Sequence, residues 1–204
     1  MRIAVLGATG RTGSVLLALA AQRGHEVIAV VRNPAAVVGA AEVRVADARD
    51  AEALSRAISG ADAVAFCVGP RDRAAGRILE EGMTATLAAM SAAGVRRLVA
   101  ISASGPFIDG DDPLMRIAKP IVQRVFAEQF SDFAAMEPLI HASTTDWTIV
   151  RPPQLKDGRP RGRYRSRLDG SVWFGMTIRR ADLAAAVLDA LESKSIWQTI
   201  SVAS

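Results

Sequence analysis

The stretch Arg2-Ile-Ala-Val-Leu-Gly7-Ala-Thr-Gly10-Arg-Thr-Gly13 decides how this chain folds. It opens with a short apolar, β-prone run and continues into a loop whose glycines are spaced Gly-x-x-Gly-x-x-Gly. Residues 14–22 are helix formers, and Gly24 follows as a candidate C-cap that ends the helix. A strand, a glycine loop and a helix are therefore expected in immediate succession.

Each of the three positions in this loop needs glycine for a different physical reason. One allows a sharp turn, one lets a pyrophosphate approach the backbone, and one lets helix and strand pack closely. The helix N-terminus adds unpaired N–H groups and the positive end of its dipole. The alternative is a tight turn that holds no ligand. We predict a dinucleotide site formed by Gly7, Thr9, Gly10, Arg11, Thr12 and Gly13.

Strands and helices alternate along the rest of the chain with short connections. Apolar, β-prone runs occur at 2–6, 26–31, 42–46, 63–68, 97–101, 147–150 and 196–202. Helices are expected at 14–22, 50–59, 74–92, 112–142 with interruptions at Pro120 and Pro138, and 180–192. This order predicts an α/β, Rossmann-type, doubly wound and mostly parallel sheet with helices on both faces. We expect one domain over 1–204, with a small substrate-side region at about 105–120 and 152–178.

The residue after the second strand bears on which dinucleotide is bound. A site that prefers NAD(H) usually has Asp or Glu there, which binds the ribose 2′-hydroxyl. This chain has Arg32, whose charge and forked donors suit a 2′-phosphate, and Arg11 could flank the same phosphate. We therefore predict NADP(H) in preference to NAD(H). The alternative is that Arg32 is a solvated loop residue.

Further candidate binding residues follow the third to sixth strands, because open α/β sheets bind ligands at the carboxyl ends of their strands. Asp47, beside Ala48, either accepts from the adenine amino group or belongs to a turn before a helix. Val68 and Gly69 allow the backbone to pass close to a cofactor. The nicotinamide and substrate are expected to meet near Ser102, Ser104, Pro152 and Pro153, with the two serines as candidate catalytic or orienting residues.

Together these residues resemble the atypical short-chain dehydrogenases/reductases, in the NAD(P)H-binding group that includes NmrA-like proteins and the flavin reductase/biliverdin reductase B type. The resemblance covers nearly the whole chain. It also rests on Arg32-Asn-Pro34, on Asp146-Trp-Thr-Ile-Val-Arg-Pro-Pro153 and on Ile178-Arg-Arg-Ala-Asp182. It implies a Rossmann core with a small C-terminal substrate region and a structural role for Asp182.

One departure from the family pattern concerns the proton donor. Classical members carry a Tyr-x-x-x-Lys pair on the helix before the sixth strand, and the aligned positions here are Gln129 and Phe133. Tyr164, the only tyrosine, lies well downstream, and His141 is expected on the far turn of that helix. Reduction of a ketone needs a proton delivered as hydride arrives. A flavin, quinone or bilin can instead collect the proton from solvent.

Three functions are therefore considered. The first is an NADPH-dependent oxidoreductase that passes hydride to a flavin, quinone or similar conjugated acceptor, so the cofactor supplies the chemistry and the protein supplies orientation. The second is a non-catalytic NADP(H)-binding redox sensor that acts through a protein partner, as NmrA-like relatives do. The third is a sugar-nucleotide epimerase, for which the chain is short and the tyrosine is missing.

Composition also indicates which kinds of site and which cellular location are expected. Cys67 is the only cysteine and there are two histidines, so we expect neither a disulfide framework nor a metal site. The apolar runs are too short for a membrane span, and the first strand leads directly into the glycine loop. We expect no cleaved signal peptide, a soluble cytoplasmic protein, a small anionic or aromatic substrate, and either a monomer or a dimer.

Five arginines recur at every second position: Arg159, Arg161, Arg163, Arg165 and Arg167. In an extended strand they would share one face. That face would form an electropositive rim that attracts an anionic substrate. Nucleic acid is a weaker interpretation because few aromatic residues are interleaved with the arginines. The alternative is an exposed edge strand whose charge discourages sheet pairing.

Overall fold

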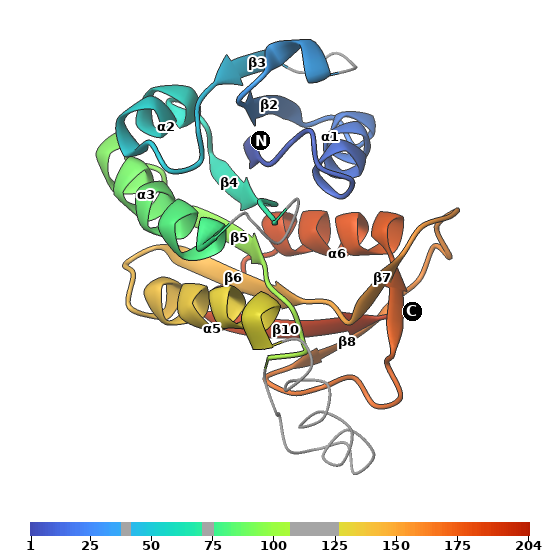
Figure 1. The fold of residues 1–204 in the computed structure, drawn as a ribbon. Coiled ribbons are helices and arrows are strands. Elements are labelled where there is room, and N and C mark those ends of the chain that lie inside the picture. The colour runs from blue at the N-terminus through green and yellow to red at the C-terminus, as the bar shows by residue number, and fades with distance from the viewer. Residues whose placement is uncertain (38–41, 71–75, 107–126) are drawn as a thin grey trace.

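The computed structural model describes residues 1–37, 42–70, 76–106 and 127–204 (Figure 1). The eight strands of its main sheet are β1 (Arg2–Leu6), β2 (Glu26–Val31), β3 (Glu42–Val45), β4 (Ala63–Phe66), β5 (Arg97–Ile101), β6 (Asp146–Arg151), β8 (Arg165–Leu168) and β10 (Gln198–Ala203). Their order across the sheet is β3-β2-β1-β4-β5-β6-β10-β8. Only β8 is antiparallel to its neighbour. This order confirms the predicted Rossmann-type, doubly wound α/β class.

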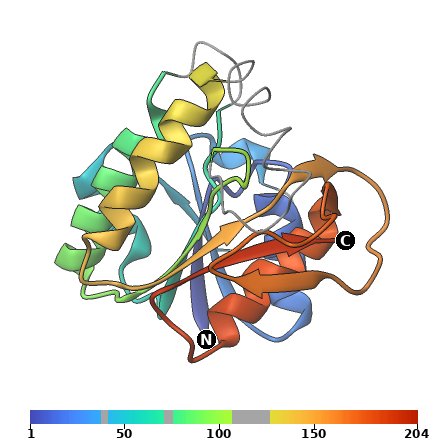
Figure 2. The same ribbon diagram turned by 90° about the horizontal axis from the view of Figure 1, so that it is seen from below.

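Helices cover both faces of the sheet (Figures 1 and 2). One face packs against α1 (Gly13–Gln22) and α6 (Arg180–Glu192), and the other against α2 (Ala51–Ile58), α3 (Ile78–Ala93) and α5 (Ala127–His141). Successive strand residues point to opposite faces, so Val5 enters the first cluster and Leu6 the second. Within the described ranges, no helix has the length and apolar character needed to cross a membrane.

Helix ends follow capping chemistry, with one contribution from outside the local sequence. Asp50 caps α2 by accepting from the Ala53 N–H at 3.0 Å, as its position predicts. In contrast, α3 begins at Ile78 rather than at the expected residue 74. Its first turn is capped by Asp132 of α5, which accepts from the N–H groups of Leu79 and Glu80 at 2.8 and 2.9 Å. A cap supplied by another helix leaves no local sequence signal.

The long helix before β6 differs from expectation. It runs through Pro138 without a break, so the interruption expected there is wrong. Met136 and Ile140, on either side of the proline, are buried in the core, and Pro138 itself is exposed. Packing on both sides outweighs the missing N–H of the proline. The expected helical part 112–126, with Pro120, lies outside the described residues.

Between β6 and β10 the chain leaves the main sheet, returns to it as the edge strand β8, and leaves it again. The excursion contains β7 (Gln154–Lys156) and β9 (Thr177–Arg179), which pair in parallel as a separate ribbon. The expected strand of five arginines is wrong in its extent, because only Arg165 and Arg167 lie on a strand, β8; this strand is at the edge of the main sheet, as the alternative predicts. Upstream of it, Gly158 and Gly162 have φ of +122° and +74°, which breaks an extended conformation.

Candidate functional site

The glycine loop connects β1 to α1 at the carboxyl edge of the sheet. Gly7 has φ +76°, and a Cβ there would lie 2.6 Å from the Cys67 carbonyl oxygen. A Cβ on Gly13 would lie 2.4 Å from the Gly7 carbonyl oxygen. Gly10 donates its N–H to that same oxygen at 2.9 Å. Any side chain at Gly7 or Gly13 would therefore displace backbone, which leaves a smooth cradle over the start of α1.

The start of α1 offers only part of its backbone donors to an anion, because the Ser14 N–H already donates to the Gly10 carbonyl at 2.9 Å. Thr12 occupies the N-cap position, yet its side chain caps no N–H, and the first turn contains no acidic residue. Thr9 is partly buried in the loop and Arg11 is exposed. The first N–H groups of a helix have no partner within the helix, and the dipole makes this end positive. The loop therefore has the geometry and the charge of a pyrophosphate site.

The ends of β2 and β3 carry the residues predicted to recognise the adenosine half. Arg32 is exposed and pairs with no carboxylate among the described residues. Arg11 instead lies 3.5 Å from Asp157 in an exposed ion pair. Asp47 accepts from the Arg49 N–H at 2.9 Å, which supports its alternative role in a turn before α2. Its neighbour Ala48 is partly buried.

The ends of β5 and β6 are held side by side beyond the strands themselves. Ser102 donates its N–H to the Val150 carbonyl and Ser104 donates to the Pro152 carbonyl, both at 2.9 Å. The two predicted serines and the two prolines are thereby brought together at the carboxyl edge. Val68 and the exposed Gly69 follow β4 at the same edge.

The two serines differ in exposure. Ser102 is 2% exposed, and its buried hydroxyl has no hydrogen-bond partner among the described residues. Ser104 is partly exposed, as is Pro153, whereas Pro152 is buried. A ligand could therefore reach Ser104 more readily than Ser102. The unpartnered Ser102 hydroxyl is a buried donor without an acceptor, which is uncommon in folded proteins.

A buried ion pair supports this edge, and the sequence did not predict it. Arg151, the last residue of β6, donates to Glu137 of α5 through Nε at 3.0 Å and Nη2 at 2.5 Å. Glu137 is 1% exposed. In the sheet, Arg151 is in register with Ser201 of β10. The two-point contact fixes the end of β6 relative to α5, directly before the two prolines.

No tyrosine lies at this edge. Phe133, at one of the positions aligned with the family's Tyr-Lys pair, packs against the core cluster of α2, α3 and α5. The side chain of Gln129 lies outside the described residues. Tyr164 donates to Asp189 at 2.6 Å, near the C-terminal end of α6, and burial followed by this hydrogen bond raises the pKa of its hydroxyl. His141 stacks near Trp147 at the start of β6, on the far turn as expected.

One aromatic residue does reach the edge. A Cβ on Gly105 would lie 2.3 Å from the Phe130 ring, so this ring stands directly over the residue that follows Ser104. Only the tertiary structure shows that it lies at the carboxyl end of β5. Nearby, burial raises the pKa of the Cys67 thiol to about 12, so this thiol stays protonated at neutral pH.

The arrangement of the loop and the strand ends matches a known family. The profile of a family described as NAD(P)H-binding matches residues 7–194. The chain belongs to this NAD(P)H-binding family. The expected membership of an NAD(P)H-binding group is confirmed with it. A nicotinamide dinucleotide is the ligand of the family, and the glycine cradle and the uncapped α1 fit its pyrophosphate.

Several proteins are similar in sequence to this NAD(P)H-binding protein. It is 41% identical over 100 residues to the Mycobacterium tuberculosis protein Rv2047c, but that match spans only 12% of the relative's length. The Bacillus subtilis protein YwnB is 28% identical, with 94% of this chain and 92% of YwnB covered. A Streptomyces 3-diazoavenalumate denitrifying reductase is 37% identical, with 56% of this chain and 44% of that enzyme covered.

Solved structures share the fold. ChuY, an anaerobillin reductase from Escherichia coli O157:H7, is 21% identical with a TM-score of 0.81, over 100% of this chain and 97% of ChuY. A short-chain dehydrogenase/reductase from Veillonella parvula in complex with NADP is 18% identical with a TM-score of 0.82, over 100% and 94% of the chains. At these identities the likeness shows the fold alone.

Proposed function

We propose that this protein is an NADPH-dependent oxidoreductase that passes hydride to a flavin, quinone or similar conjugated acceptor. One observation carries the choice of acceptor. At the position where the family has a tyrosine or lysine, α5 carries Phe133, which packs in the core. The only tyrosine of the chain, Tyr164, is hydrogen-bonded to Asp189 near the C-terminal end of α6, away from the carboxyl edge where the nicotinamide is expected. The reductase names of the Streptomyces relative and of ChuY support a reductase of this kind.

Each part of the edge has a proposed task. Gly7, Gly10 and Gly13 admit the pyrophosphate onto the N–H groups of α1. When bound, the cofactor supplies the hydride, so the task of the protein is to orient the cofactor and the acceptor relative to each other. Ser104 is the partly exposed hydroxyl that orients the nicotinamide or acceptor, and the buried Ser102 hydroxyl lies two residues before it. Pro152 and Pro153 form a wall of the pocket without donating hydrogen bonds.

The preference for NADPH rests on Arg32. Its guanidinium is exposed at the end of β2 and has no carboxylate partner among the described residues, so it is available to a 2′-phosphate. Arg11 is held by Asp157 in an exposed pair, which is weak enough to exchange for a phosphate. NADH would leave the Arg32 charge without a partner.

The proposal is tested by steady-state turnover of NADPH with FMN, a soluble quinone, and simple ketones under one set of conditions. We expect the flavin or quinone to be reduced faster than every ketone, because only the ketones need a positioned proton donor. Faster turnover of a ketone than of any flavin or quinone would overturn it.

The turnover assay also bears on a second candidate function. The core position of Phe133 fits a non-catalytic NADP(H)-binding redox sensor equally well. Tight NADPH binding by calorimetry, no turnover with any acceptor, and recovery of a protein partner only in the presence of dinucleotide would favour the sensor.

A further inference from the structure

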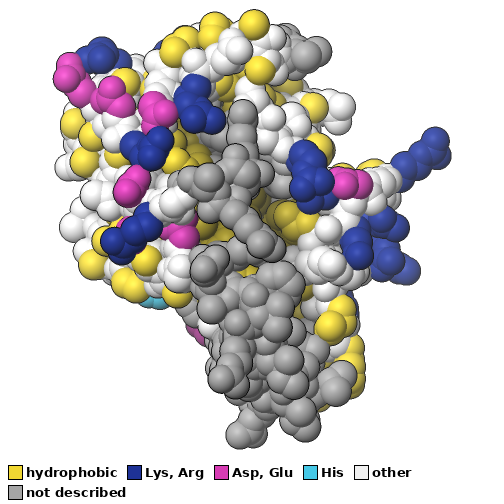
Figure 3. Space-filling view, viewed as in Figure 1, with side chains coloured by type: hydrophobic (Ala, Val, Ile, Leu, Met, Phe, Trp, Pro, Cys, Tyr) yellow, Lys and Arg dark blue, Asp and Glu magenta, His cyan; other side chains and the backbone are white. Residues whose placement is uncertain are grey.

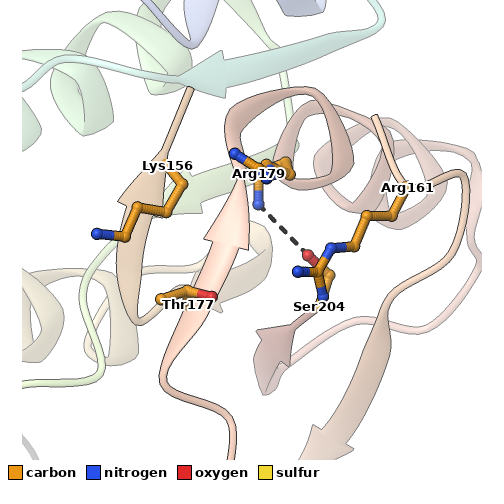
Figure 4. Close-up of a pocket in the computed structure, with 5 residues that line it drawn as sticks. All are labelled: Lys156, Arg161, Thr177, Arg179 and Ser204. Carbon is orange, nitrogen blue, oxygen red and sulfur yellow. Dashed lines mark hydrogen bonds between the residues drawn. The ribbon is translucent and has the colours of Figure 1, made fainter. Parts of the chain in front are cut away.

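A cavity of about 250 Å³ lies among the segments of the C-terminal excursion (Figure 4). We call it the cation cavity; it is lined by Lys156, Arg161, Thr177, Arg179 and Ser204. Three of the five lining residues are cationic and the other two carry hydroxyls. None of them belongs to the glycine loop or follows β1 to β6 directly. Figure 3 shows Lys and Arg side chains gathered over the β7 side of the molecule.

Four separate segments bring the side chains together. Lys156 of β7 is in register with Arg179 of β9, so both lie on one face of the ribbon, and Thr177 shares that face. The intervening Leu155 and Ile178 face the core. Arg161 comes from the connecting segment, and Figure 4 shows its guanidinium beside Ser204 at the end of β10. Lys156 stands at the margin, with its ammonium directed away from Arg161.

The turn that carries Arg161 is held in place by Asp182, which bonds to the backbone of the turn and not to the Arg161 side chain. Asp182 is 2% exposed and accepts from the backbone N–H of Arg161 at 3.0 Å and of Gly162 at 3.2 Å. These bonds confirm the structural role that the family resemblance implies for Asp182. The Asp182 carboxylate accepts from these backbone donors and forms no ion pair with the Arg161 guanidinium, which lines the cavity.

The other nearby acid is also occupied. The Asp157 carboxylate lies 2.5 Å from Arg180 and 3.5 Å from Arg11. The Arg179 guanidinium donates to the backbone carbonyl of Asp157 and not to its carboxylate. Among the residues that the structure describes, Lys156, Arg161 and Arg179 form no ion pair with a carboxylate. The cation cavity therefore gathers three cationic side chains that form no ion pair among the described residues.

We propose that the cation cavity is a second anion site, which binds the phosphate group of a small molecule. Guanidinium groups donate to phosphate oxygens at two points, and the hydroxyls of Thr177 and Ser204 offer further donors. The volume exceeds that of one phosphate, so a phosphate ester fits as well as the free ion. This inference goes beyond the proposed oxidoreductase activity and needs no turnover to be tested.

Calorimetry and thermal unfolding of the full chain test the proposal with inorganic phosphate as the probe. NADP⁺ is kept saturating so that the glycine loop is filled, and sodium chloride at equal ionic strength is the control for screening. We expect phosphate to bind and to raise Tm beyond the chloride control. Loss of phosphate binding when NADP⁺ is saturating would overturn the proposal, because the phosphate would then occupy the dinucleotide site.

Matched variants locate the site. Arg161→Gln removes a guanidinium that bonds to no described carboxylate, and we expect about tenfold weaker phosphate binding. Lys156→Gln should weaken binding less, because Lys156 stands at the margin. Arg163→Gln is the control, since Arg163 belongs to the same segment but does not line the cavity. Equal phosphate affinity in wild type and Arg161→Gln would contradict the proposal.

A last comparison separates the two sources of phosphate. FMN and riboflavin differ only in the phosphate, so their affinities are measured in wild type and in Arg161→Gln. Weaker FMN binding with unchanged riboflavin binding in the variant supports a phosphate carried by the acceptor. Unchanged affinity for both flavins, with phosphate binding still lost, supports a separate phosphate ligand at the cation cavity.

Discussion

The glycine loop at residues 7–13 and the cation cavity both suit anions, but they are built from different parts of the chain. The loop uses backbone N–H groups at one helix start, and its glycines keep side chains out of the way. The cavity uses side chains from β7, β9, a connecting segment and the end of β10. Backbone sites need small residues at fixed spacing, whereas side-chain sites need only that distant residues converge.

The largest expected effect concerns the ion pair at the point where the chain leaves the sheet for the excursion. Glu137→Ala removes the carboxylate that the buried Arg151 contacts, and should lower the free energy of unfolding by about 3–5 kcal/mol. Glu137→Leu combined with Arg151→Met should recover most of this loss, since neither charge of this pair then remains buried. Urea unfolding measures both; a double variant as unstable as the single one would contradict the explanation.

The next prediction breaks the glycine loop. Gly13→Ala places a Cβ 2.4 Å from the Gly7 carbonyl oxygen, so the loop must shift. We expect NADPH to bind about 10- to 100-fold more weakly, with phosphate binding at the cation cavity unchanged. Gly24→Ala is the control: Gly24 has positive φ but faces open space, so an alanine there should cost stability without changing NADPH affinity. Calorimetry with each ligand measures the difference.

A smaller effect tests how the loop side selects its dinucleotide. Arg32→Asp should weaken NADPH about 10- to 100-fold, the loss of a charged hydrogen bond plus repulsion of the 2′-phosphate. NADH affinity should stay the same or improve, because Asp can bind the ribose hydroxyls. Arg163→Gln, a change of another exposed arginine, should leave both affinities unchanged. NADPH affinity unaltered by Arg32→Asp would refute the assigned role.

The smallest effect uses pH. The pKa of the folded Cys67 thiol is raised from 9.0 to about 12 by burial, so the folded state keeps a proton that the unfolded state loses. Stability should therefore fall as pH rises above about 9, by roughly 1 kcal/mol per pH unit from this group. Cys67→Ala should show a flatter decline between about pH 9 and about pH 11 in urea unfolding, with parallel curves below about pH 8. Identical slopes above pH 9 would disprove it.

The strength of the local signals explains which elements were predicted well. The strands β1, β2 and β5 have the expected bounds, because each is an apolar run ended by Gly, Asn-Pro or Ser. The ends of α2 follow from Asp50 and Gly60 for the same reason. The start of α3 and the continuity of α5 through Pro138 were missed, since both depend on contacts between helices.

The candidate site divides in the same way. The glycines, Ser104 and the two prolines could be placed at one edge because parallel strands align their carboxyl ends. Phe130 over Gly105 and the pair of Glu137 with Arg151 gave no signal of their own. Alternating arginines suggested one strand, but Gly162, which has positive φ, divides the segment, and Gly158 with positive φ precedes it.

By itself, the sequence determined the Rossmann-type fold, the dinucleotide loop and the missing tyrosine, because these depend on periodicity, glycine spacing and residue identity. The tertiary structure alone decided that Asp132 caps another helix, that Asp182 and Asp157 are already occupied, and that Arg161, Arg179 and Ser204 converge. Pairing between segments far apart in the chain depends on packing, and packing leaves no regular pattern along the sequence.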